Sequence, residues 1–477
     1  MALDRVKAVY RSVLFQIVIV GLVAFCEPGI WTALNNLGAG GNAKPFLNNA
    51  ANALTYGLMS IGCFIAGGVT NKITAKWTLF IGAAFYTPYA AGLYCNNRYG
   101  NEWFMLLGAA LCGIGASLLW ASEAAIAVGY PEAEKRGRYV GIWMGIRQMG
   151  PLVGGAISLA LNIKTKEKGK VTYTTYLGLV AISSLGAPFA LLLSQPQKVV
   201  RKNGTKIPYM KKTDFKTEAR AIFRQLKNPY MLLLIPVFLA GQFGVTYQGN
   251  YLTSKFSSPP PEGESVQADP SLPAYFTVRS RALASFLTAA VGALANLFTG
   301  IILDLPSFSR PAKSKFVYLF VLVAVTTSWT WNAVVQTKLT RMADPPSFDL
   351  GDGPFFNSAF TVYMCFRFFY EVLQTYIYWL MAEIKGAQGD GDVARTTGIL
   401  RSWESIGSTI AYAIGAVHIP NQTQMIVGFA LWAVTVPFTL LAVFGDWNRG
   451  VPEDKAGQTD ESDVEVQSVQ YDGERKL

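Results

Sequence analysis

Seven charged residues lie inside apolar stretches of this chain, where a charge is costly. They are Glu27, Glu123, Arg147, Arg367, Glu371, Arg401 and Glu404. A charged side chain at the centre of a bilayer costs about 2.5–3.5 kcal/mol on insertion scales. Such residues therefore pair with one another or face water, and they are candidates for binding a charged solute or carrying a proton.

The spacing of four of these residues predicts ion pairs within single helices. Arg367 and Glu371 are one helical turn apart, and Arg401 and Glu404 are three residues apart. Side chains three or four positions apart are neighbours on a helix surface. We therefore expect Arg367 to pair with Glu371, and Arg401 with Glu404.

The remaining charges need partners on other helices. Glu123 lies near the end of one apolar segment and Arg147 near the start of the next. At about 1.5 Å per residue, antiparallel helices would bring them to similar depths, which predicts a Glu123–Arg147 pair. Glu27 stands apart, directly before Pro28. This proline either frees backbone carbonyls beside a transporter site or simply kinks the helix.

These charges have two interpretations. In the functional one, they line a central cavity that binds a polar or charged solute, and Glu27, Glu123 or Glu371 takes up protons. In the structural one, the pairs lock helices together or hold one closed state. A common cavity reached by Glu27, Arg147 and Glu371 would favour solute binding, whereas sealed pairs would favour locking.

Twelve apolar segments must position these side chains. Of the 477 residues, 51% are apolar and 15% are charged, whereas soluble domains carry about 25% charged residues. Segments of about 20 apolar residues cross a hydrocarbon core as helices. We expect them at residues 12–34, 48–70, 77–94, 103–129, 139–161, 173–194, 230–250, 278–302, 316–336, 356–382, 397–417 and 422–445. The predicted fold class is an all-α membrane protein with twelve transmembrane helices.

The positive charges predict the orientation in the membrane. With the N-terminus in the cytosol, segments on that side carry more than twice as many Lys and Arg residues as segments on the other side. Cytosolic loops of membrane proteins are enriched in these residues. Both termini are then cytosolic, and the net charge of +11 reflects topology rather than nucleic-acid binding. The sequence does not distinguish the plasma membrane from a vacuolar or endosomal membrane.

The predicted segments divide the chain into four parts. Residues 1–194 form an N-terminal six-helix half, 195–229 a basic cytosolic linker, 230–446 a C-terminal six-helix half and 447–477 an acidic cytosolic tail. The tail has few large apolar groups, so we expect it to be disordered.

The linker carries a predicted amphipathic helix. Its apolar positions share one helix face: Phe215, Ala219, Ile222, Phe223 and Leu226. Its other face is basic: Lys212, Lys216, Arg220, Arg224 and Lys227. The helix either lies on the cytosolic membrane surface near anionic headgroups or packs on the bundle as a linker.

The two halves show traces of an internal repeat. One constant offset overlays Arg138 on Arg395 and Gly141 on Gly398, at the starts of the fifth and eleventh segments. Repeats of this kind are common in secondary transporters. The matches predict two pseudo-symmetric halves.

Loops after the second and eighth segments carry a short shared motif. The first copy contains Gly67, Asn71 and Lys72, and the second contains Gly300 and Asp304. Twelve segments, a charged central loop and this G-x-x-x-[DN] pattern resemble the major facilitator superfamily. The resemblance implies that the motif acid latches neighbouring helices on the cytosolic side. The first copy departs from the pattern, with Asn71 in place of an acid and Thr74 in place of a glycine, which implies a weaker latch.

Longer stretches resemble the fungal branch of the Unc-ninety-three-like family within that superfamily. They are "PGIWTALNNLGAGG" (28–41), "LLWASEAAIAVGYPEAEKRGRYVGIW" (118–143), "VVRKNGTKI" (199–207) and "YQGNY" (247–251). The resemblance covers nearly the whole chain apart from the tail. It implies a multi-pass membrane protein with the facilitator fold, but no particular solute, because relatives include regulators and trafficking chaperones of other membrane proteins.

Several activities find little support in the sequence. The single histidine, His418, and the absence of a Cys/His cluster argue against a metal site. No Walker-type loop indicates ATP binding. We therefore expect neither an enzyme nor a bound cofactor. Two functions remain: ion-gradient-driven or facilitative transport of a small solute by alternating access, or regulation or trafficking of another membrane protein by a facilitator-fold scaffold.

Overall fold

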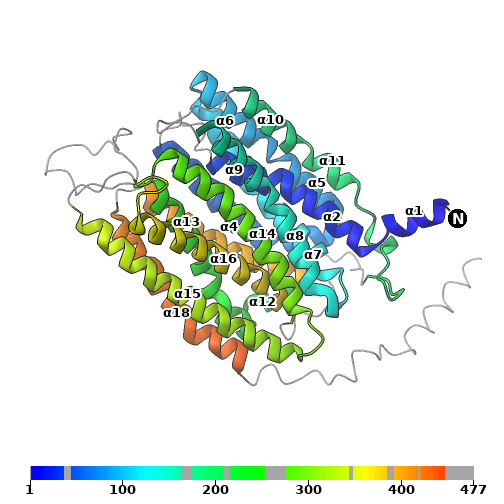
Figure 1. Cartoon of the computed structure of the whole chain (residues 1–477). Helices are drawn as coiled ribbons and strands as arrows, with labels where there is room; N and C mark the ends of the chain where they lie inside the picture. Colours follow the sequence, from blue (N-terminus) through cyan, green and yellow to red (C-terminus); the bar gives the residue numbers. More distant parts are fainter. Residues whose placement is uncertain are drawn as a thin grey trace, which may run out of the picture.

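The protein is a bundle of helices in the computed structural model, which describes residues 2–36, 45–162, 173–207, 215–253, 275–342, 348–383, 392–416 and 419–445 (Figure 1). The α-helices are α1 (Ala2–Tyr10), α2 (Val13–Ala24), α3 (Ile30–Asn36), α4 (Pro45–Ile73), α5 (Ala75–Ala84), α6 (Thr87–Tyr99), α7 (Glu102–Gly129), α8 (Arg136–Arg147), α9 (Met149–Asn162), α10 (Tyr173–Ser184), α11 (Gly186–Leu191), α12 (Phe215–Leu226), α13 (Pro229–Thr253), α14 (Val278–Leu303), α15 (Arg310–Arg341), α16 (Pro354–Glu383), α17 (Asp392–Ala416) and α18 (Asn421–Phe444). A π-helical turn, η1 (Phe25–Gly29), joins α2 to α3, and 3-10 turns lie at η3 (Ala133–Lys135) and η4 (Pro196–Lys198). Within the described residues, β structure is limited to isolated bridges.

Local sequence signals begin several of these helices. Pro45, Pro229 and Pro354 are the first residues of α4, α13 and α16. Proline suits this position because the first N–H groups of a helix have no partner within the helix. At α2, the Ser12 side chain accepts a hydrogen bond of 3.2 Å from the N–H of Phe15, which satisfies one of those groups.

Three of the predicted segments are each divided between two helices. The breaks fall between α5 and α6, between α8 and α9, and between α10 and α11. Each break lies within one turn before a proline, namely Pro88, Pro151 or Pro188. Proline lacks the N–H that would bond the preceding turn, so the helix is weakened there. Helices α8 and α9 nevertheless continue along one direction (Figure 1).

Within the described residues, seven helical stretches are long and apolar enough, by length and composition, to cross a membrane. They are Val13–Asn35, Leu47–Ile73, Glu102–Gly129, Pro229–Gly249, Arg279–Leu303, Arg310–Arg341 and Asn421–Phe444. A further apolar stretch, Tyr176–Leu191, is shorter. The remaining predicted segments are divided by prolines or, in α16 and α17, contain the buried charges discussed below.

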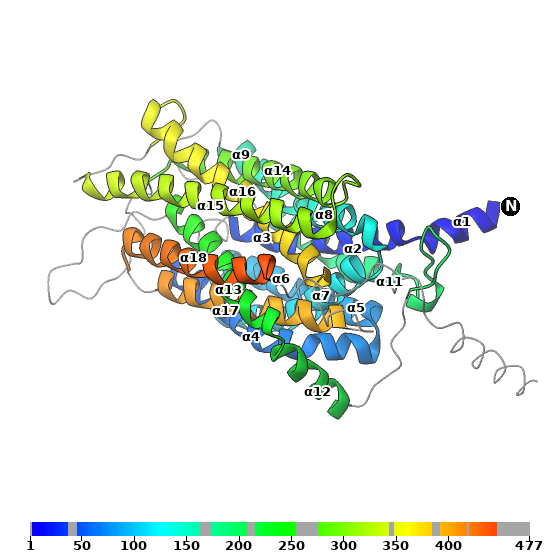
Figure 2. The same cartoon turned by 90° about the horizontal axis from the view of Figure 1, so that it is seen from below.

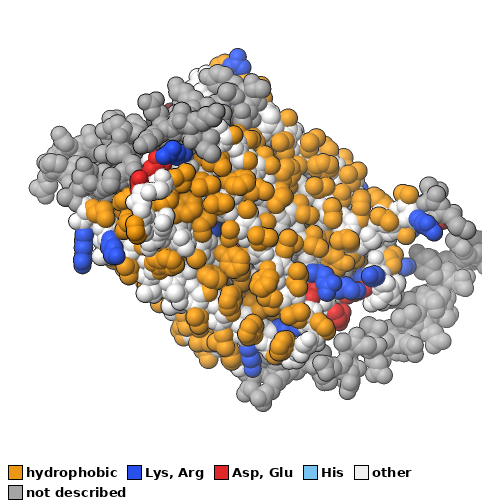
Figure 3. Space-filling view, in the orientation of Figure 1, with side chains coloured by type: hydrophobic (Ala, Val, Ile, Leu, Met, Phe, Trp, Pro, Cys, Tyr) orange, Lys and Arg blue, Asp and Glu red, His pale blue; other side chains and the backbone are white. Residues whose placement is uncertain are grey.

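The outer surface of the bundle is apolar. On α14, Leu294, Phe298 and Ile301 are 65%, 56% and 59% exposed. On the face shown in Figure 3, hydrophobic side chains form a continuous belt and most charged side chains lie near its two ends. Soluble monomers rarely expose so large an apolar surface. The chain is therefore an integral membrane protein.

The helices before and after the linker pack against each other along two crossings. At the α4–α17 crossing, α4 packs along α17, and at the α8–α14 crossing, α8 and α9 pack along α14 (Figure 2). A Cβ on Gly398 would lie 2.5 Å from the Cys63 carbonyl oxygen, and one on Gly141 would lie 2.6 Å from the Asn296 carbonyl oxygen. Only glycine allows backbones to approach this closely.

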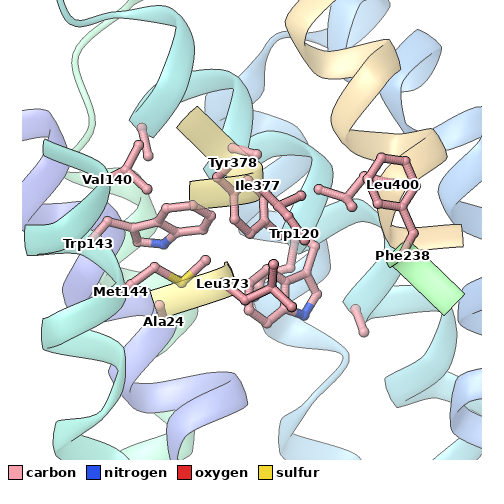
Figure 4. Packing of buried hydrophobic residues seen from close by; sticks show 14 of the residues in the cluster. Ala24, Trp120, Val140, Trp143, Met144, Phe238, Leu373, Ile377, Tyr378 and Leu400 are labelled. Carbon is pink, nitrogen blue, oxygen red and sulfur yellow. The ribbon is translucent and has the colours of Figure 1, made fainter. Parts of the chain in front are cut away.

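The centre of the bundle is filled by aromatic and aliphatic side chains from both sets of helices (Figure 4). Trp120 on α7 and Trp143 on α8 have ring centroids 6.0 Å apart, and the Trp143 and Tyr378 rings are 5.1 Å apart. Edge-on aromatic pairs at these separations are favourable. The core therefore lies where α7, α8 and α16 meet.

The linker contains the predicted amphipathic helix, now α12, but the helix buries a different face. Glu218 and Gln225 are buried, with 5% and 2% exposed, whereas Phe223 is 59% exposed. The apolar stripe predicted from spacing therefore lies beside the buried face and does not coincide with it. The expected disordered tail, residues 447–477, and His418 lie outside the described residues.

Candidate functional site

Arg147 on α8 and Glu371 on α16 form an ion pair between the two sets of helices. Nη2 of Arg147 lies 3.1 Å from Oε2 and 3.4 Å from Oε1 of Glu371. Arg367, one turn earlier on α16, places its Nη2 3.6 Å from Oε1. The Glu371 side chain is 2% exposed, while those of Arg147 and Arg367 remain 15% and 18% exposed. The predicted Arg367–Glu371 pair is confirmed, and a second guanidinium shares the same carboxylate.

Helix α14 holds the other side of this carboxylate. The Asn296 amide donates a hydrogen bond of 3.2 Å to Oε2 of Glu371. Its own carbonyl oxygen accepts a 2.7 Å bond from the Thr375 hydroxyl. These two bonds fix the orientation of the Asn296 amide and keep Glu371 directed towards the crossing.

Arg401 and Glu404 form the second predicted pair, within α17. Nη1 of Arg401 lies 2.8 Å from Oε2 of Glu404. The Gln374 amide donates a 2.7 Å hydrogen bond to the other carboxylate oxygen, and Arg401 also donates to the Tyr378 hydroxyl. Both charged side chains are almost fully buried, so each needs these partners to offset its desolvation.

An indole ring lies beside both arginines. The Arg401 guanidinium carbon is 3.6 Å from the Trp120 ring centroid, and that of Arg147 is 5.9 Å away. Tryptophan offers the most favourable aromatic face for a cation. Trp120 therefore connects the Arg147–Glu371 cluster to the Arg401–Glu404 pair.

The predicted Glu123–Arg147 pair is wrong. Glu123 is fully buried and accepts a 3.0 Å hydrogen bond from the Trp143 indole N–H. Its second oxygen has no hydrogen-bond partner in the described part of the chain. Trp143 lies one turn before Arg147 on α8 and stands at the level of Glu123, so the depth arithmetic was in error by one helical turn.

Glu27 is held among the N-terminal helices. It lies in the π-helical turn η1 together with Pro28, where a proline lacks the N–H needed for a regular helix. Oε2 accepts a 3.0 Å hydrogen bond from the Ser183 hydroxyl. A Cβ on Gly186 would lie 2.1 Å from Oε1, so glycine is required beside this carboxyl group. Glu27 is 1% exposed, so it is sealed, unlike the partly exposed Arg147.

At the end of the bundle predicted to be cytosolic, Asp304 holds the first turn of α8. Its Oδ1 accepts the Gly137 N–H and its Oδ2 the Arg138 N–H, both at 2.8 Å. The Arg138 Nε donates a further 3.0 Å bond to Oδ2. An anion is favourable at a helix N-terminus because the N–H dipoles point towards it. Burial raises the pKa of Asp304, and these donors oppose the shift.

More ion pairs join the two sets of helices at the same end. Arg136 on α8 contacts Glu383 on α16, with Nη1 and Oε1 2.6 Å apart. Arg310 on α15 lies 3.1 Å from Glu134 and 3.6 Å from Glu383. Burial lowers the pKa of Arg136, and Glu383 opposes this shift. In the described chain, this end is therefore closed by charges contributed from both sides of the α8–α14 crossing.

Sequence comparisons relate this chain to a known group of proteins. A family model described as "Ion channel regulatory protein UNC-93" matches residues 49–254. A protein named Notoamide biosynthesis cluster protein O' from Aspergillus versicolor is 30% identical over 408 residues, which cover 86% of this chain and 83% of that protein. An UNC93-like protein from Schizosaccharomyces pombe is 29% identical over 445 residues, covering 92% of this chain and 83% of that protein. The chain belongs to the UNC-93 family.

Over a shorter stretch, this UNC-93 protein is similar to a protein that is named as a transporter. An MFS-type transporter from Penicillium decumbens is 34% identical over 98 residues, which are 20% of this chain and 17% of that protein. The predicted resemblance to the Unc-ninety-three-like family is confirmed.

The first copy of the G-x-x-x-[DN] motif in this UNC-93 protein carries Asn71 where the second copy carries Asp304. Gly67 lies against α17, and a Cβ there would be 2.6 Å from the Ala394 carbonyl oxygen. Asn71 follows one turn later on α4, and Lys72 lies in its exposed last turn. Thr74 has φ of 79° and ψ of 149°, a conformation that suits glycine and strains a β-branched residue.

The acid that is missing from the first copy has a counterpart on the linker helix. Glu218 of α12 pairs with Arg395 at the start of α17 through bonds of 2.8 Å and 3.0 Å. Both side chains are buried, at 6% and 5% exposed. Arg395 is the residue that the internal repeat overlays on Arg138, the partner of Asp304. The structure thus places one carboxylate at each of the two repeated positions.

Several residues of this candidate site were not identified from the sequence. Asn296 and Gln374 were visible only as amides inside apolar segments, and Glu218 only as the one acid on a basic helix. Trp143 gave no signal, because aromatic residues in membrane segments mostly pack. No group of His, Cys, Asp and Glu among the described residues is arranged to hold a metal ion.

Proposed function

We propose that this UNC-93 protein is a secondary transporter of a small solute, in which two six-helix halves alternate access to a site between them. The halves are residues 1–194 and 230–446, joined by the linker 195–229 and followed by the cytosolic tail 447–477. The single observation that carries the proposal is the Arg147–Glu371 ion pair, which joins one half to the other with a buried carboxylate and a partly exposed guanidinium.

The packing supports twelve spanning helices with a two-fold repeat. The offset that overlays Gly141 on Gly398 also relates their contacts: Gly141 faces the Asn296 carbonyl, and Gly398 faces the Cys63 carbonyl. The offset between the two motif copies relates Cys63 to Asn296 as well. The α4–α17 crossing is therefore the counterpart of the α8–α14 crossing, as expected for duplicated halves.

The ion pairs at the cytosolic end support a closed state on that side. Asp304 holds α8, and Arg136, Glu383 and Arg310 link the halves around it. Opening towards the cytosol would have to break these contacts. The excess of Lys and Arg at this end supports cytosolic termini, in accord with the tendency of membrane proteins to keep these residues inside.

The central cluster supplies groups for a solute and for protons. Arg147 and Arg367 remain partly exposed and share one carboxylate, so an anionic group of a solute would compete with Glu371 for a guanidinium. Glu123 has an oxygen with no hydrogen-bond partner among the described residues, and burying an unpaired charge is costly. We assign proton uptake to Glu371 and Glu123, with Glu27 as a separate carboxyl group in the N-terminal half.

Transport is tested with purified protein in proteoliposomes that contain a pH-sensitive dye. A panel of amino acids, organic acids and sugars is added outside, and internal pH is recorded. We expect one class of solute to move protons with the native protein, and Glu371→Gln and Arg147→Ala to abolish the signal while the protein remains folded. Glu102→Gln, at an exposed carboxyl group at the start of α7, is the matched control and should retain it.

The alternative is a facilitator-fold scaffold that regulates or traffics another membrane protein. Two observations favour it: the family model is described as an ion channel regulatory protein, and Glu27, Glu371 and Glu404 are sealed. It predicts that no solute in the panel moves protons, and that Glu371→Gln changes the abundance or location of a co-purifying membrane protein in cells. That combination of results would reject transport.

A further inference from the structure

Helix α12 has one face that packs on the bundle and other faces that are directed away from it. On the packed face, a Cβ on Gly68 of α4 would lie 3.5 Å from both Oε2 of Glu218 and Cδ1 of Ile222. Gln225 is buried on the same face. The buried pair of Glu218 with Arg395 extends this contact to α17. The helix is therefore attached to both members of the α4–α17 crossing.

The outward faces of α12 combine an exposed aromatic ring with positive charge. Phe223 is 59% exposed, and the Lys227 ammonium lies 4.7 Å from its ring centroid. Lys216, Arg220 and Arg224 are all exposed. Glu218 is the only acid in the helix and faces the bundle, so the side chains directed away from the bundle carry positive charge only.

Helix α12 packs on α4 and α17 at the end of the bundle where α4 ends and α17 begins (Figure 2). This end is the one predicted to be cytosolic, so the outward faces of α12 are placed to meet the cytosolic leaflet. Proteins use exposed aromatic residues and clustered Lys and Arg at this level to contact anionic headgroups. Anionic lipid of the cytosolic leaflet matches both the charge and the apolar ring.

We propose that α12 binds anionic lipid headgroups of the cytosolic leaflet and that this contact keeps Glu218 on Arg395, where it replaces the acid missing at Asn71. Lipid binding and closure of the α4–α17 crossing are then coupled, because the same helix carries both. The coupling holds whether the protein transports a solute or regulates a partner.

Lipid binding is tested by hydrogen–deuterium exchange of the full chain in nanodiscs. Discs of phosphatidylcholine alone are compared with discs that also contain phosphatidylserine. We expect phosphatidylserine to slow exchange in residues 215–226 and 392–398 by about fivefold. Replacing Lys216, Arg220 and Arg224 together by Gln should remove this effect.

A second triple variant controls for general loss of charge. Lys198, Lys202 and Lys206 are exposed in the same linker, and replacing them by Gln should leave the phosphatidylserine effect intact. The proposal is overturned if exchange is the same in both lipids, or if the two triple variants lose the effect equally.

The role of Glu218 is tested by removal and rescue. Glu218→Gln should speed exchange at residues 392–398 by about tenfold or more, because it removes a carboxylate from the buried Arg395 guanidinium. Adding Asn71→Asp in the same chain should restore slow exchange, because it returns an acid to α4 one turn from Gly67, which faces α17. A double variant that exchanges as fast as Glu218→Gln alone would show that Glu218 does not replace the motif acid.

Discussion

The two crossings between the halves use the same backbone geometry but different charges. At both, a glycine of one helix lies against a carbonyl oxygen of the other, at Gly141 and at Gly398. The α8–α14 crossing adds charges from its own neighbourhood, namely Asp304 at the end predicted to be cytosolic and Glu371 in its core. The α4–α17 crossing receives Glu218 from the linker. The two crossings therefore share the shape of their backbone contact and differ in the source of their charge.

The two crossings should respond differently if the helices before and after the linker move apart. Charges built into a crossing must break when the halves separate, whereas a charge on a linker helix can leave with that helix. On the proposed mechanism, the α8–α14 crossing is the more permanent tie between the halves, and the α4–α17 crossing is the one that the linker helix can control.

The largest expected effect comes from removing the central carboxylate of the α8–α14 crossing. Glu371→Ala leaves Arg147 and Arg367 without their shared partner and should lower the free energy of unfolding by about 3–5 kcal/mol. Thermal unfolding in detergent can be followed with a thiol-reactive dye, because Cys26, Cys63 and Cys112 are free and buried.

Glu404 provides the comparison, because its ion-pair partner Arg401 lies on the same helix. Glu404→Ala also leaves an arginine, but Arg401 keeps its contacts with Trp120 and Tyr378. Its cost should be clearly smaller than that of Glu371→Ala. Equal costs would show that the tie across the halves has no special weight.

A second prediction tests whether the two crossings are packed equally closely. Gly141→Ala and Gly398→Ala place a methyl group 2.6 Å and 2.5 Å, respectively, from a backbone oxygen of the facing helix, so each should destabilise the protein by about 1–3 kcal/mol. Gly178→Ala, in α10 with no neighbour within 4 Å, should be neutral or stabilising and serves as the control. A large difference between the two crossing variants would contradict the repeat.

A third prediction concerns the residue between α4 and α5, where Thr74 stands in place of the glycine of the superfamily pattern. Thr74→Gly should stabilise the protein by about 1 kcal/mol, because φ of 79° strains threonine and not glycine. Gly204→Ala is the reciprocal control, since φ there is 83° with open space around it, and it should destabilise. The measurement is the same thermal unfolding assay, and destabilisation by Thr74→Gly would show that the threonine side chain contributes more than its strain costs.

The smallest expected effect is a pH dependence at the second motif copy. The pKa of Asp304 is raised by burial above its ordinary value of 3.8. The folded state therefore holds this proton more tightly than the unfolded state, so the resulting stability is present below 3.8 and is lost as pH rises through the folded pKa.

Asp304→Asn removes the titrating group and isolates this contribution. The difference in unfolding free energy between the native protein and D304N should decrease as pH rises from below 3.8 towards neutrality. A difference that grows over this range would mean that the hydrogen bonds from Gly137 and Arg138 dominate over burial.

The sequence by itself determined the positions of the helices and the pairs within them. Apolar length places the segments, because a buried backbone in lipid must bond to itself, and spacing of three or four residues is enough to predict Arg367–Glu371 and Arg401–Glu404. The overlay of Arg138 on Arg395 related two positions, and the structure shows that each of them pairs with a carboxylate.

Only the tertiary structure decided which charges meet between helices. Arg147 contacts Glu371 rather than Glu123, and Glu218 turns its carboxylate to Arg395 rather than to solvent. Helix depth is known from the sequence only to about one turn, and the rotation of one helix against another is set by side-chain packing and glycine contacts. An error of one turn, about 5.4 Å, is enough to exchange one ion-pair partner for another.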